Sequence, residues 1–539
     1  MKALTGTWTL ARLALRRDRI RLPVWVLLAA GLVASTASTM KSSYTTEEQR
    51  REYAESVVSN PASAVFSGPG FGADTLGGMT VAEAGALLVF LLALPAVLLV
   101  VRHTRAEEEA GRAELLGAAI LGRHARLASA MLVAGAVMLA IACVTALSLI
   151  GYGAPVAGSL AFGFSMALVG WTFAGVAAVT AQFFAHARTA TGAAAAVFGL
   201  AFMLRAAGDA SAASGDGGVV KHLSWLSPIG WAQQVRPFGG ERWWVFALPI
   251  AAVALLTGAA VRLGARRDVD AGLIAPRPGR PGGSPYLASS WGLAWRLQRG
   301  GLIGWAAGVA VVAGVFGAVA HDIEELVGSN EDVADSITKL GGGDTVTNGY
   351  LAWVLTITGF MAAAYAITAV LRLRTEETGL RAEPVLATTV TRRRWVASHL
   401  ACAAAGTVAL MVVAGLVVGT VHGLRSGDMA GELSRMLAGA LVRVPAALIL
   451  AAGGVAVFGL LPRVTAFIWA LAAGALVLEQ LGGVLELDQR VLNLSPFAHT
   501  PDLPGGDFSA TPLIWLGGIS AGLVVAGLVG FRRRDTPIA

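Results

Sequence analysis

Two stretches of the sequence repeat the same order of charged and apolar residues, 269 positions apart. The first reads RAELLGAAILGR over residues 112–123, and the second reads RAEPVLATTVTR over residues 381–392. In each, an Arg, a Glu and a later Arg flank apolar residues at helical spacing, which predicts a short amphipathic helix. An apolar ridge between charges of both signs is suited to docking into a groove on another protein. The candidate docking residues are Arg112, Glu114, Leu115, Leu116 and Arg123 in the first stretch, and Arg381, Glu383, Val385, Leu386 and Arg392 in the second.

For an isolated loop, the alternative is a solvated segment whose arginines only set the membrane topology. Topology requires positive charge alone, whereas both copies also keep a Glu and an apolar stripe in the same order. Pro384 fits the second helix if it lies in the first turn, where a backbone N–H has no helical partner. The repetition therefore favours docking.

No set of residues forms a recognisable catalytic or metal-binding site. The eight His are scattered, and the two Cys, Cys143 and Cys402, lie inside apolar segments without metal-ligand spacing. A G-x-x-x-x-G-K-[ST] phosphate loop is absent from the sequence, so the chain cannot bind ATP in the P-loop manner. We expect no catalytic residue, no metal and no cofactor in this chain.

The elements that position the charged stretches are predicted to be membrane helices. Hydrophobic residues make up 55% of the chain and charged residues 14%, and the apolar residues form long blocks. A helix needs about 20 mostly apolar residues to cross a bilayer, which predicts an all-α integral membrane protein. The fifth and eleventh predicted spans are the least secure and are alternatively half-spans. The twelve predicted spans are 22–40, 82–101, 128–151, 156–184, 190–206, 243–261, 301–320, 350–371, 396–420, 436–460, 465–482 and 512–531.

The net charge of +7 is explained by topology rather than by a nucleic-acid partner. With the N-terminus in the cytoplasm, most of the 41 Lys and Arg fall in the N-terminal segment, the cytoplasmic connections and the tail. This bias predicts that both termini are cytoplasmic and that the acidic stretch 321–337 lies outside. The abundance of Arg, Ala and Gly is typical of a GC-rich bacterial genome, which favours a bacterial plasma membrane.

A Pro- and Gly-rich segment, APRPGRPGGSPY at residues 275–286, divides the chain near its middle. Matching phrases occur in the same order on both sides; the last pair is LSPIGWAQQVRPFGG at 226–240 and LSPFAHTPDLPGG at 494–506. The sequence therefore predicts a tandem duplication. Its parts are a first six-span half at 1–270, a cytoplasmic linker at 271–288 and a second six-span half at 289–539. Because six is even, the two repeats are parallel in the membrane.

Over essentially its whole length, the chain resembles the membrane subunit of ATP-binding-cassette exporters with six spans per half, the type V exporters. It is similar to actinobacterial exporters of polyketide antibiotics such as tetronasin. The RAE phrases resemble the coupling-helix motif of that family, and the LSP phrases resemble its re-entrant segments. The resemblance places connecting helices at 8–21 and 284–299, coupling helices at 107–126 and 376–395, and re-entrant segments at 222–240 and 490–506. Ser227, Pro228, Ser495 and Pro496 mark the re-entrant segments.

The resemblance implies an ATP-driven permease for a drug, a polyketide antibiotic or a lipid. Since this chain lacks a phosphate loop, ATP and Mg²⁺ are expected on a separate soluble ATPase, present as two copies for the two coupling helices. The expected mechanism is alternating access at the seam between the halves. Few charges in the spans suit a hydrophobic or amphiphilic substrate taken from the surrounding membrane lipids. Candidate pathway residues, for which packing or lipid contact is the alternative, are Phe162, Phe164, Trp171, Phe360, Met361 and Arg443.

Two other functions remain open at this point. An ion-coupled secondary multidrug transporter would also fit twelve spans in two halves, but it usually needs ionisable residues within its spans. Those present are few: Glu83, Arg205, Arg443 and Glu479. A membrane scaffold that docks ATPases without transporting anything is the second alternative, and the short outer loops argue only weakly against it.

Overall fold

A computed structural model of the chain describes residues 3–58, 64–65, 67–112, 121–213, 218–268, 271–275, 282–320, 345–481, 488–501 and 503–534. Within these ranges every regular element is helical, which confirms the all-α prediction. The chain divides into two compact units, Met1–Gly279 and Arg280–Ala539. The division falls inside the predicted linker at 271–288.

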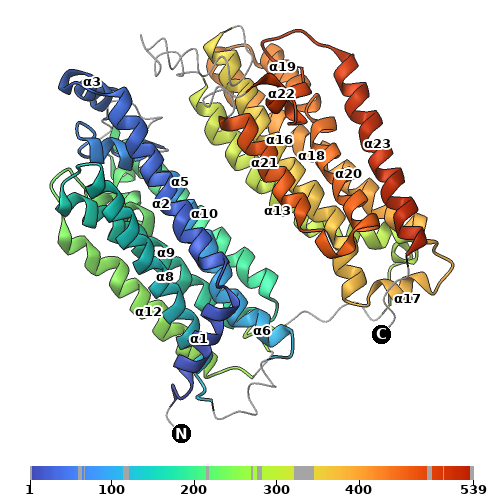
Figure 1. Cartoon of the computed structure of the whole chain (residues 1–539), viewed down its shortest axis with the longest axis horizontal. Helices are drawn as coiled ribbons and strands as arrows, with labels where there is room; N and C mark the ends of the chain where they lie inside the picture. Colours follow the sequence, from blue (N-terminus) through green and yellow to red (C-terminus); the bar gives the residue numbers. More distant parts are fainter. Residues whose placement is uncertain are drawn as a thin grey trace. The chain divides into compact units, whose positions relative to one another are not determined.

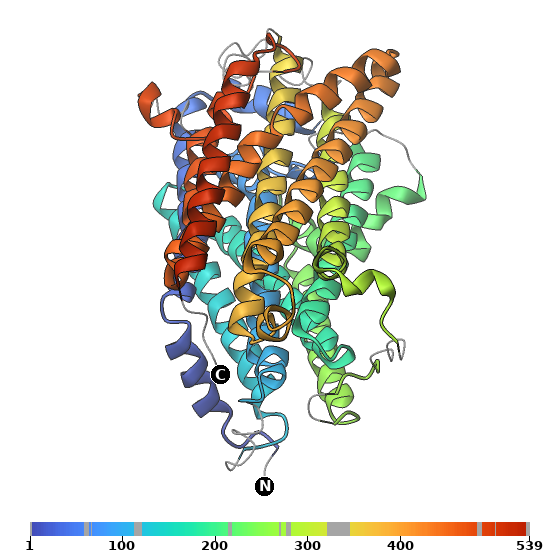
Figure 2. The ribbon, with the colours of Figure 1, turned by 90° about the vertical axis from the view of Figure 1, so that its right-hand side faces the viewer.

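The first unit contains six helices long and apolar enough to cross a membrane (Figures 1 and 2). Short helices lie at its two ends, with α1 and α6 at one end and α3 at the other. Its elements are α1 (Thr7–Arg17), α2 (Arg21–Ser43), α3 (Glu47–Val58), α5 (Leu76–His103), α6 (Arg105–Glu109), α8 (Ala125–Gly151), α9 (Val156–Phe183), α10 (Ala187–Ala213), η1 (Val219–Leu226), α11 (Pro228–Gln234), η2 (Trp243–Phe246) and α12 (Ala247–Gly264).

The second unit contains five such helices and a shorter apolar one, Phe467–Gln480. In Figure 1, α17 lies at the end of this unit where the chain terminates, and α22 lies at the other end. Its elements are η3 (Pro285–Ala288), α13 (Ser290–Val319), α16 (Val346–Thr378), α17 (Ala382–Leu386), α18 (Arg392–Ser426), α19 (Met429–Leu441), α20 (Val444–Leu460), η4 (Pro462–Val464), α21 (Phe467–Leu481), α22 (Gln489–Leu492), η5 (Phe497–His499) and α23 (Ala510–Arg533).

The predicted spans correspond closely to these helices. The fifth, predicted as short, is a full helix of 27 residues, α10. The eleventh is the short apolar helix of α21, in agreement with the doubt about its length. The tenth consists of α19 and α20, which meet at Arg443. The segment predicted as a separate connecting helix at 284–299 is η3 followed by the first turns of α13, which continues into the span without a break.

Equivalent Thr side chains start the second span of each unit. Thr75 Oγ1 accepts a hydrogen bond from the Gly78 backbone N–H at 3.0 Å, and Thr345 Oγ1 accepts one from Asn348 at 3.2 Å. These are N-caps that satisfy a free donor of the first turn. The two caps lie 270 residues apart, close to the 269 residues that separate the two charged stretches.

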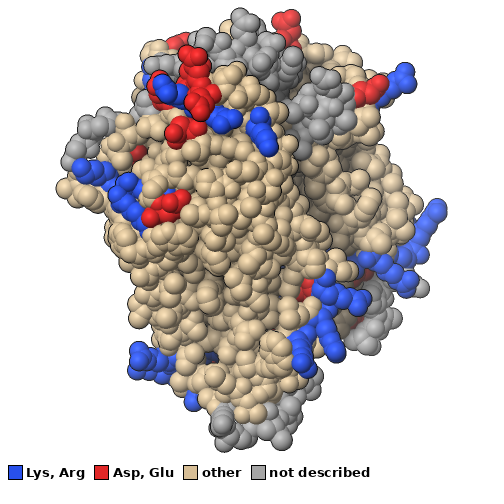
Figure 3. Space-filling view, turned by 60° about the vertical axis from the view of Figure 1, so that its left-hand side comes forward, with Lys and Arg blue, Asp and Glu red and all other residues tan. Residues whose placement is uncertain are grey.

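The core of the first unit forms around α9, which packs against α5, α8, α10 and α12. Small residues allow this close packing: a Cβ added at Gly163 would lie 2.4 Å from the Ala142 carbonyl oxygen. In the second unit, α16 and α20 are the most buried spans. The last spans, α12 and α23, are apolar but little buried, as expected for helices that face lipid. Figure 3 shows a wide uncharged face with Lys, Arg, Asp and Glu gathered towards its ends.

Candidate partner-docking site

The two charged stretches connect the second and third spans of their units. Glu114, Leu115 and Leu116 lie outside the described residues, while Arg112 and Arg123 on either side are described. The second copy is described throughout. There the chain leaves α16, turns at Leu380 with φ 56°, forms α17 and enters α18, whose N-cap is Thr391. We call residues 105–125 and 376–392 the first and second connections.

In α17 of the second connection, the charges of the RAE phrase face outward and the apolar stripe faces inward. Arg381 and Glu383 are exposed, whereas Val385 and Leu386 are half-buried against the apolar cluster that contains Trp395. Pro384 lies in the first turn of α17, as predicted. A hollow of about 390 Å³ opens beside this helix. Its lining consists of Glu377, Leu380, Ala382, Glu383, Leu386, Ala387, Val390, Thr391, Arg392, Trp395 and Phe531.

A buried pair of carboxylates stands at the start of each connection. Glu107 and Glu108 in the first unit and Glu376 and Glu377 in the second are each less than a tenth exposed. These four Glu were not among the residues predicted from the sequence. The repeat did contain a signal for them, because the second pair follows the first at the same spacing of 269 residues and each pair lies shortly before its RAE phrase. Buried carboxylates require partners, because an unpaired charge away from water is costly.

The first Glu of each pair binds the Arg that opens the RAE phrase. Arg112 Nε donates to Glu107 Oε2 at 2.8 Å, and Arg112 Nη2 donates to Glu107 Oε1 at 3.0 Å. Arg381 Nε donates to Glu376 Oε2 at 2.8 Å. These hydrogen bonds raise the pKa of both arginines above their usual value. Two of the predicted docking residues therefore also fix the shape of the connections.

The second Glu of each pair binds an Arg that follows the last span. Arg267 Nη1 and Nη2 donate to the two Glu108 oxygens at 2.8 and 2.9 Å. In the second unit, Arg534 Nη2 donates to the Glu377 oxygens at 2.6 and 2.8 Å. Because a charge-assisted bond in a buried setting is strong, each connection is fastened at its start to the end of its unit's last span.

The Arg that closes each phrase fastens the connection a second time. Arg123 Nη2 donates to the carbonyl oxygen of Ala265 at 2.6 Å, and Arg392 Nη1 donates to that of Arg534 at 3.0 Å. Ala265 and Arg534 are the C-cap residues of α12 and α23. A cation at the C-terminal end of a helix satisfies free carbonyl groups and complements the helix dipole.

In the first unit, α1 is also bound to the connection. Arg17 makes an ion pair with Glu107. Asp18, directly after α1, forms an ion pair with Arg102, whose Nη1 lies 2.8 Å from Asp18 Oδ1, and its Oδ2 lies 2.6 Å from His103 Nε2. The predicted connecting helix at 8–21 is therefore joined by charge to the end of α5.

Both LSP phrases form short helical segments capped by their Ser. Ser227 Oγ accepts from the Ile229 N–H at 3.2 Å, and Pro228 occupies the first turn of α11. Ser495 Oγ accepts from the Phe497 N–H at 3.3 Å and donates to Glu479 Oε2 at 2.8 Å, with Pro496 capping η5. At seven residues or fewer, α11 and η5 are too short to cross a bilayer.

The candidate pathway residues have packing partners inside their own units. Phe162 is fully buried in the first unit, and Phe164 and Trp171 pack at the edge of the same cluster. In the second unit, Phe360 stacks on Phe497 with ring centroids 4.1 Å apart, and Met361 is half-buried. Phe162 and Phe360 therefore have packing contacts within their units, and their role in a pathway stays a prediction.

Arg443 lies buried at the junction of α19 and α20. Its guanidinium donates to four oxygens, at distances between 2.6 and 3.0 Å. They belong to Ala352, Thr356, Gly439 and Leu503. Such a set satisfies the donors of one arginine, so Arg443 holds α16, α19 and the segment before α23 together.

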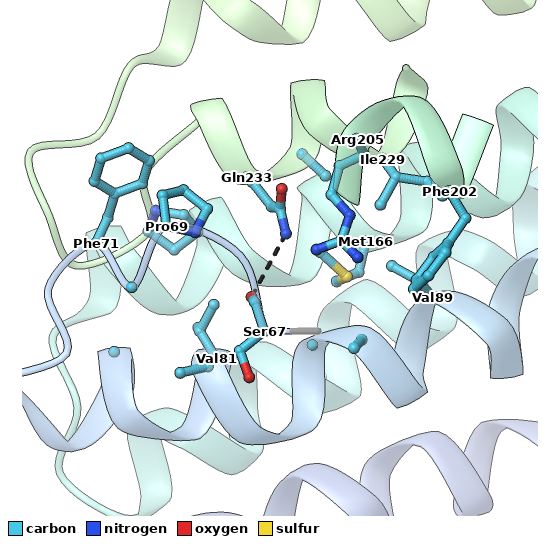
Figure 4. Close-up of a pocket in the computed structure, with 17 residues that line it drawn as sticks. Ser67, Pro69, Phe71, Val81, Val89, Met166, Phe202, Arg205, Ile229 and Gln233 are labelled. Atoms are coloured by element: carbon cyan, nitrogen blue, oxygen red, sulfur yellow. Dashed lines mark hydrogen bonds between the residues drawn. The ribbon is translucent and has the colours of Figure 1, made fainter. Parts of the chain in front are cut away.

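A small cavity lies under the LSP phrase of the first unit, between α5, α9 and α10 (Figure 4). Arg205 reaches it from α10; this residue is 1% exposed and lies 3.6 Å from Asp209. Gln233 Nε2 donates to the Ser67 carbonyl oxygen at 3.5 Å. The volume of about 40 Å³ suits a water molecule, not a drug.

Two comparisons with known proteins point to the same kind of membrane protein, a multidrug efflux permease. The family described as the C-terminal domain of the multidrug efflux system permease Rv1217c matches residues 287–532. The chain is also 43% identical to the multidrug efflux system permease protein Rv1217c of Mycobacterium tuberculosis (strain ATCC 25618 / H37Rv) over 532 residues, which cover 98% of this chain and 95% of that protein. Together with its many apolar helices, this similarity identifies the chain as a multi-pass membrane protein of the multidrug efflux system permease family.

Proposed function

We propose that the chain is the permease of an ATP-binding-cassette exporter of the type V architecture. A soluble ATPase dimer docks on the two connections, and its closure on ATP drives alternating access. The observation that supports this most is the repeated connection: both copies carry the same buried Glu pair and the same attachments to the last span. A loop that only sets the membrane topology needs neither the buried Glu pair nor the attachments to the last span.

The proposed orientation places both connections and both termini in the cytoplasm of a bacterial plasma membrane. The permease itself holds no nucleotide, so ATP and Mg²⁺ bind to the partner. An ion-coupled mechanism is less well supported, because Arg443 is fixed by four oxygens and Arg205 lies beside Asp209. A proton carrier needs a group that exchanges its proton with the pathway.

The proposed substrate is a hydrophobic or amphiphilic compound taken from the membrane. Its candidate classes are drugs, polyketide antibiotics of the tetronasin type and lipids. Transport of fluorescent drugs, a tetronate polyketide and a labelled phospholipid by cells with and without the permease distinguishes these classes.

The first experiment is affinity purification from native membranes with mass spectrometry calibrated for stoichiometry. We expect two copies of a P-loop ATPase for each permease. Glu383→Lys, which reverses an exposed charge on α17, is expected to release this subunit, whereas reversal of the exposed Arg533 leaves it bound. A complex without an ATPase under mild extraction would reject ATP coupling.

A further inference from the structure

We propose that Arg267 and Arg534 transmit movement of the connections to the last span of each unit, acting as positioning residues for transport. This inference rests on the proposed function, in which an ATPase moves the connections. The inference identifies the last span of each unit as the element that the connection moves. Neither arginine lies in the RAE phrases, and both lie directly after a last span.

The geometry fastens each connection to its last span at two points. In the second unit, Glu377 at the start of the connection binds the Arg534 guanidinium, and Arg392 at its end binds the Arg534 carbonyl oxygen. In the first unit, Glu108 and Arg123 make the corresponding bonds within residues 265–267. A connection attached at both ends to one short segment cannot shift without moving that segment or breaking charge-assisted bonds.

The last spans are the least buried spans of their units. Of the most apolar 18 residues of each span, 11% are buried in α23 and 22% in α12, against 67% in α16 and 78% in α9. Within its unit α12 packs mainly on α9, and α23 packs closely on α20. A span with little buried surface costs less free energy to displace than a core span, so a pull on residues 267 or 534 acts on the last span before the core.

The two attachments differ in the other residues that bind the second Glu of each pair. Glu108 also lies 2.9 Å from Arg105 Nη1 and 3.6 Å from Arg126 Nη2. Arg105 in turn donates through Nε and Nη2 to the Ala181 carbonyl oxygen at the end of α9. Within the described residues, Arg534 is the one ion-pair partner of Glu377. Movement in the first unit is therefore shared with α9, whereas in the second unit it passes to α23.

The test uses charge reversal in the second unit of the full complex. Glu377→Arg and Arg534→Glu each break the attachment, and the double variant restores opposite charges. Drug export is measured per folded permease and per ATP hydrolysed, below the thermal transition of the least stable variant. We expect each single variant to hydrolyse ATP but to export about tenfold less drug per ATP, in the range of coupling between contacting residues.

The double variant is expected to recover most of this loss. The matched control is Arg533→Glu, which changes the same charge at an exposed neighbour that has no ion pair among the described residues. Unchanged export per ATP in the single variants, or no recovery in the double variant, would overturn the proposal. A merely structural pair would lower the amount of folded protein and leave this ratio unchanged.

A second design covers single variants that fold poorly. Cys residues replace Glu377 and Arg534 in a chain whose Cys143 and Cys402 are changed to Ala, and a short bis-maleimide joins them. The joined protein should export drug, and the unjoined protein should not; equal export by both would contradict the proposal. If no ATPase copurifies with the wild-type chain, the proposed function is wrong. The role of the Glu377–Arg534 attachment is then still tested by the loss of drug export from cells in the single variants and its recovery in the double variant.

Discussion

Replacing Arg534 with Ala should destabilise the protein more than replacing Arg267 with Ala. Glu377 is 7% exposed and has no second ion-pair partner among the described residues. Removing one partner of a buried pair costs about 3–5 kcal/mol, because the other charge stays buried. The Arg534 guanidinium also lies over the rings of Phe458 at 4.8 Å and Phe531 at 5.1 Å. Each such contact contributes about 0.5–1 kcal/mol, so we expect a loss of about 4–7 kcal/mol.

The first unit offers the matched comparison. Without Arg267, Glu108 keeps Arg105 at 2.9 Å, so its charge is not left unpaired. What is lost is the bidentate bond and the bond from Arg267 Nε to Gln182 Oε1 at 2.7 Å, and hydrogen bonds to charged groups contribute about 1.5–3 kcal/mol. The Arg267→Ala variant should therefore lose roughly half as much free energy of unfolding as Arg534→Ala, or less.

The assay is thermal unfolding of the purified protein in detergent, followed by fluorescence-detected size exclusion. At about 2 °C per kcal/mol for units of this size, Arg534→Ala should lower the midpoint by about 8–14 °C and Arg267→Ala by about 3–6 °C. Adding Glu377→Gln to Arg534→Ala should recover much of the loss, because no charge remains to be buried. Equal shifts for the two arginines, or no recovery with Glu377→Gln, would refute this reasoning.

Three further predictions concern packing and the LSP segments. Gly527→Ala should lower the free energy of unfolding by about 1–3 kcal/mol, because the added Cβ would lie 2.5 Å from the Val455 carbonyl oxygen on α20. Gly522→Ala, where a Cβ meets open space, is the control in the same melting experiment. Arg443→Met should lower the melting midpoint strongly, because four buried oxygens lose their donor, and the dependence of drug export on the membrane proton gradient should not change. Ser495→Ala removes the acceptor of the Phe497 N–H and the bond to Glu479. A loss of about 1 kcal/mol is expected, and unchanged melting would contradict a stabilising role for these two bonds.

The positions of the spans could be predicted from the sequence because bilayer thickness fixes both the length and the composition of a membrane helix. The short helix α21 is one of the two spans predicted as the least secure; the other, α10, is a full helix of 27 residues. The junction of α19 and α20 was harder to predict. Arg443 inside an apolar run suggests an ion-coupling residue, yet its oxygen partners at Ala352 and Leu503 are 91 and 60 residues away. No periodicity in the sequence reports such distant partners.

The candidate site was predicted only in outline for a related reason. The repeat identified Arg112 and Arg381 as equivalent, but a pattern of charges does not say which charges pair. Their partners, Glu107 and Glu376, stand beside other Glu residues in the runs RAEEE and TEET. The structure buries them because the end of the second span lies against the segment that follows the last span, and contacts of that kind depend on the tertiary fold.

The two connections keep the same attachments but differ in what surrounds them. Arg126 in the first unit corresponds to Trp395 in the second at the 269-residue spacing of the two connections. The hollow beside the first connection, about 290 Å³, is lined by five charged residues, Glu108, Arg123, Arg126, Arg267 and Asp268. The hollow beside the second, about 390 Å³, is lined by three, Glu377, Glu383 and Arg392, and otherwise mainly by aliphatic and aromatic side chains. Two identical ATPase subunits would therefore meet a more strongly charged surface on the first connection and a more apolar surface on the second. Since charge mainly governs association rate and apolar burial mainly governs dissociation, raised salt should weaken docking at the first connection before it affects the second.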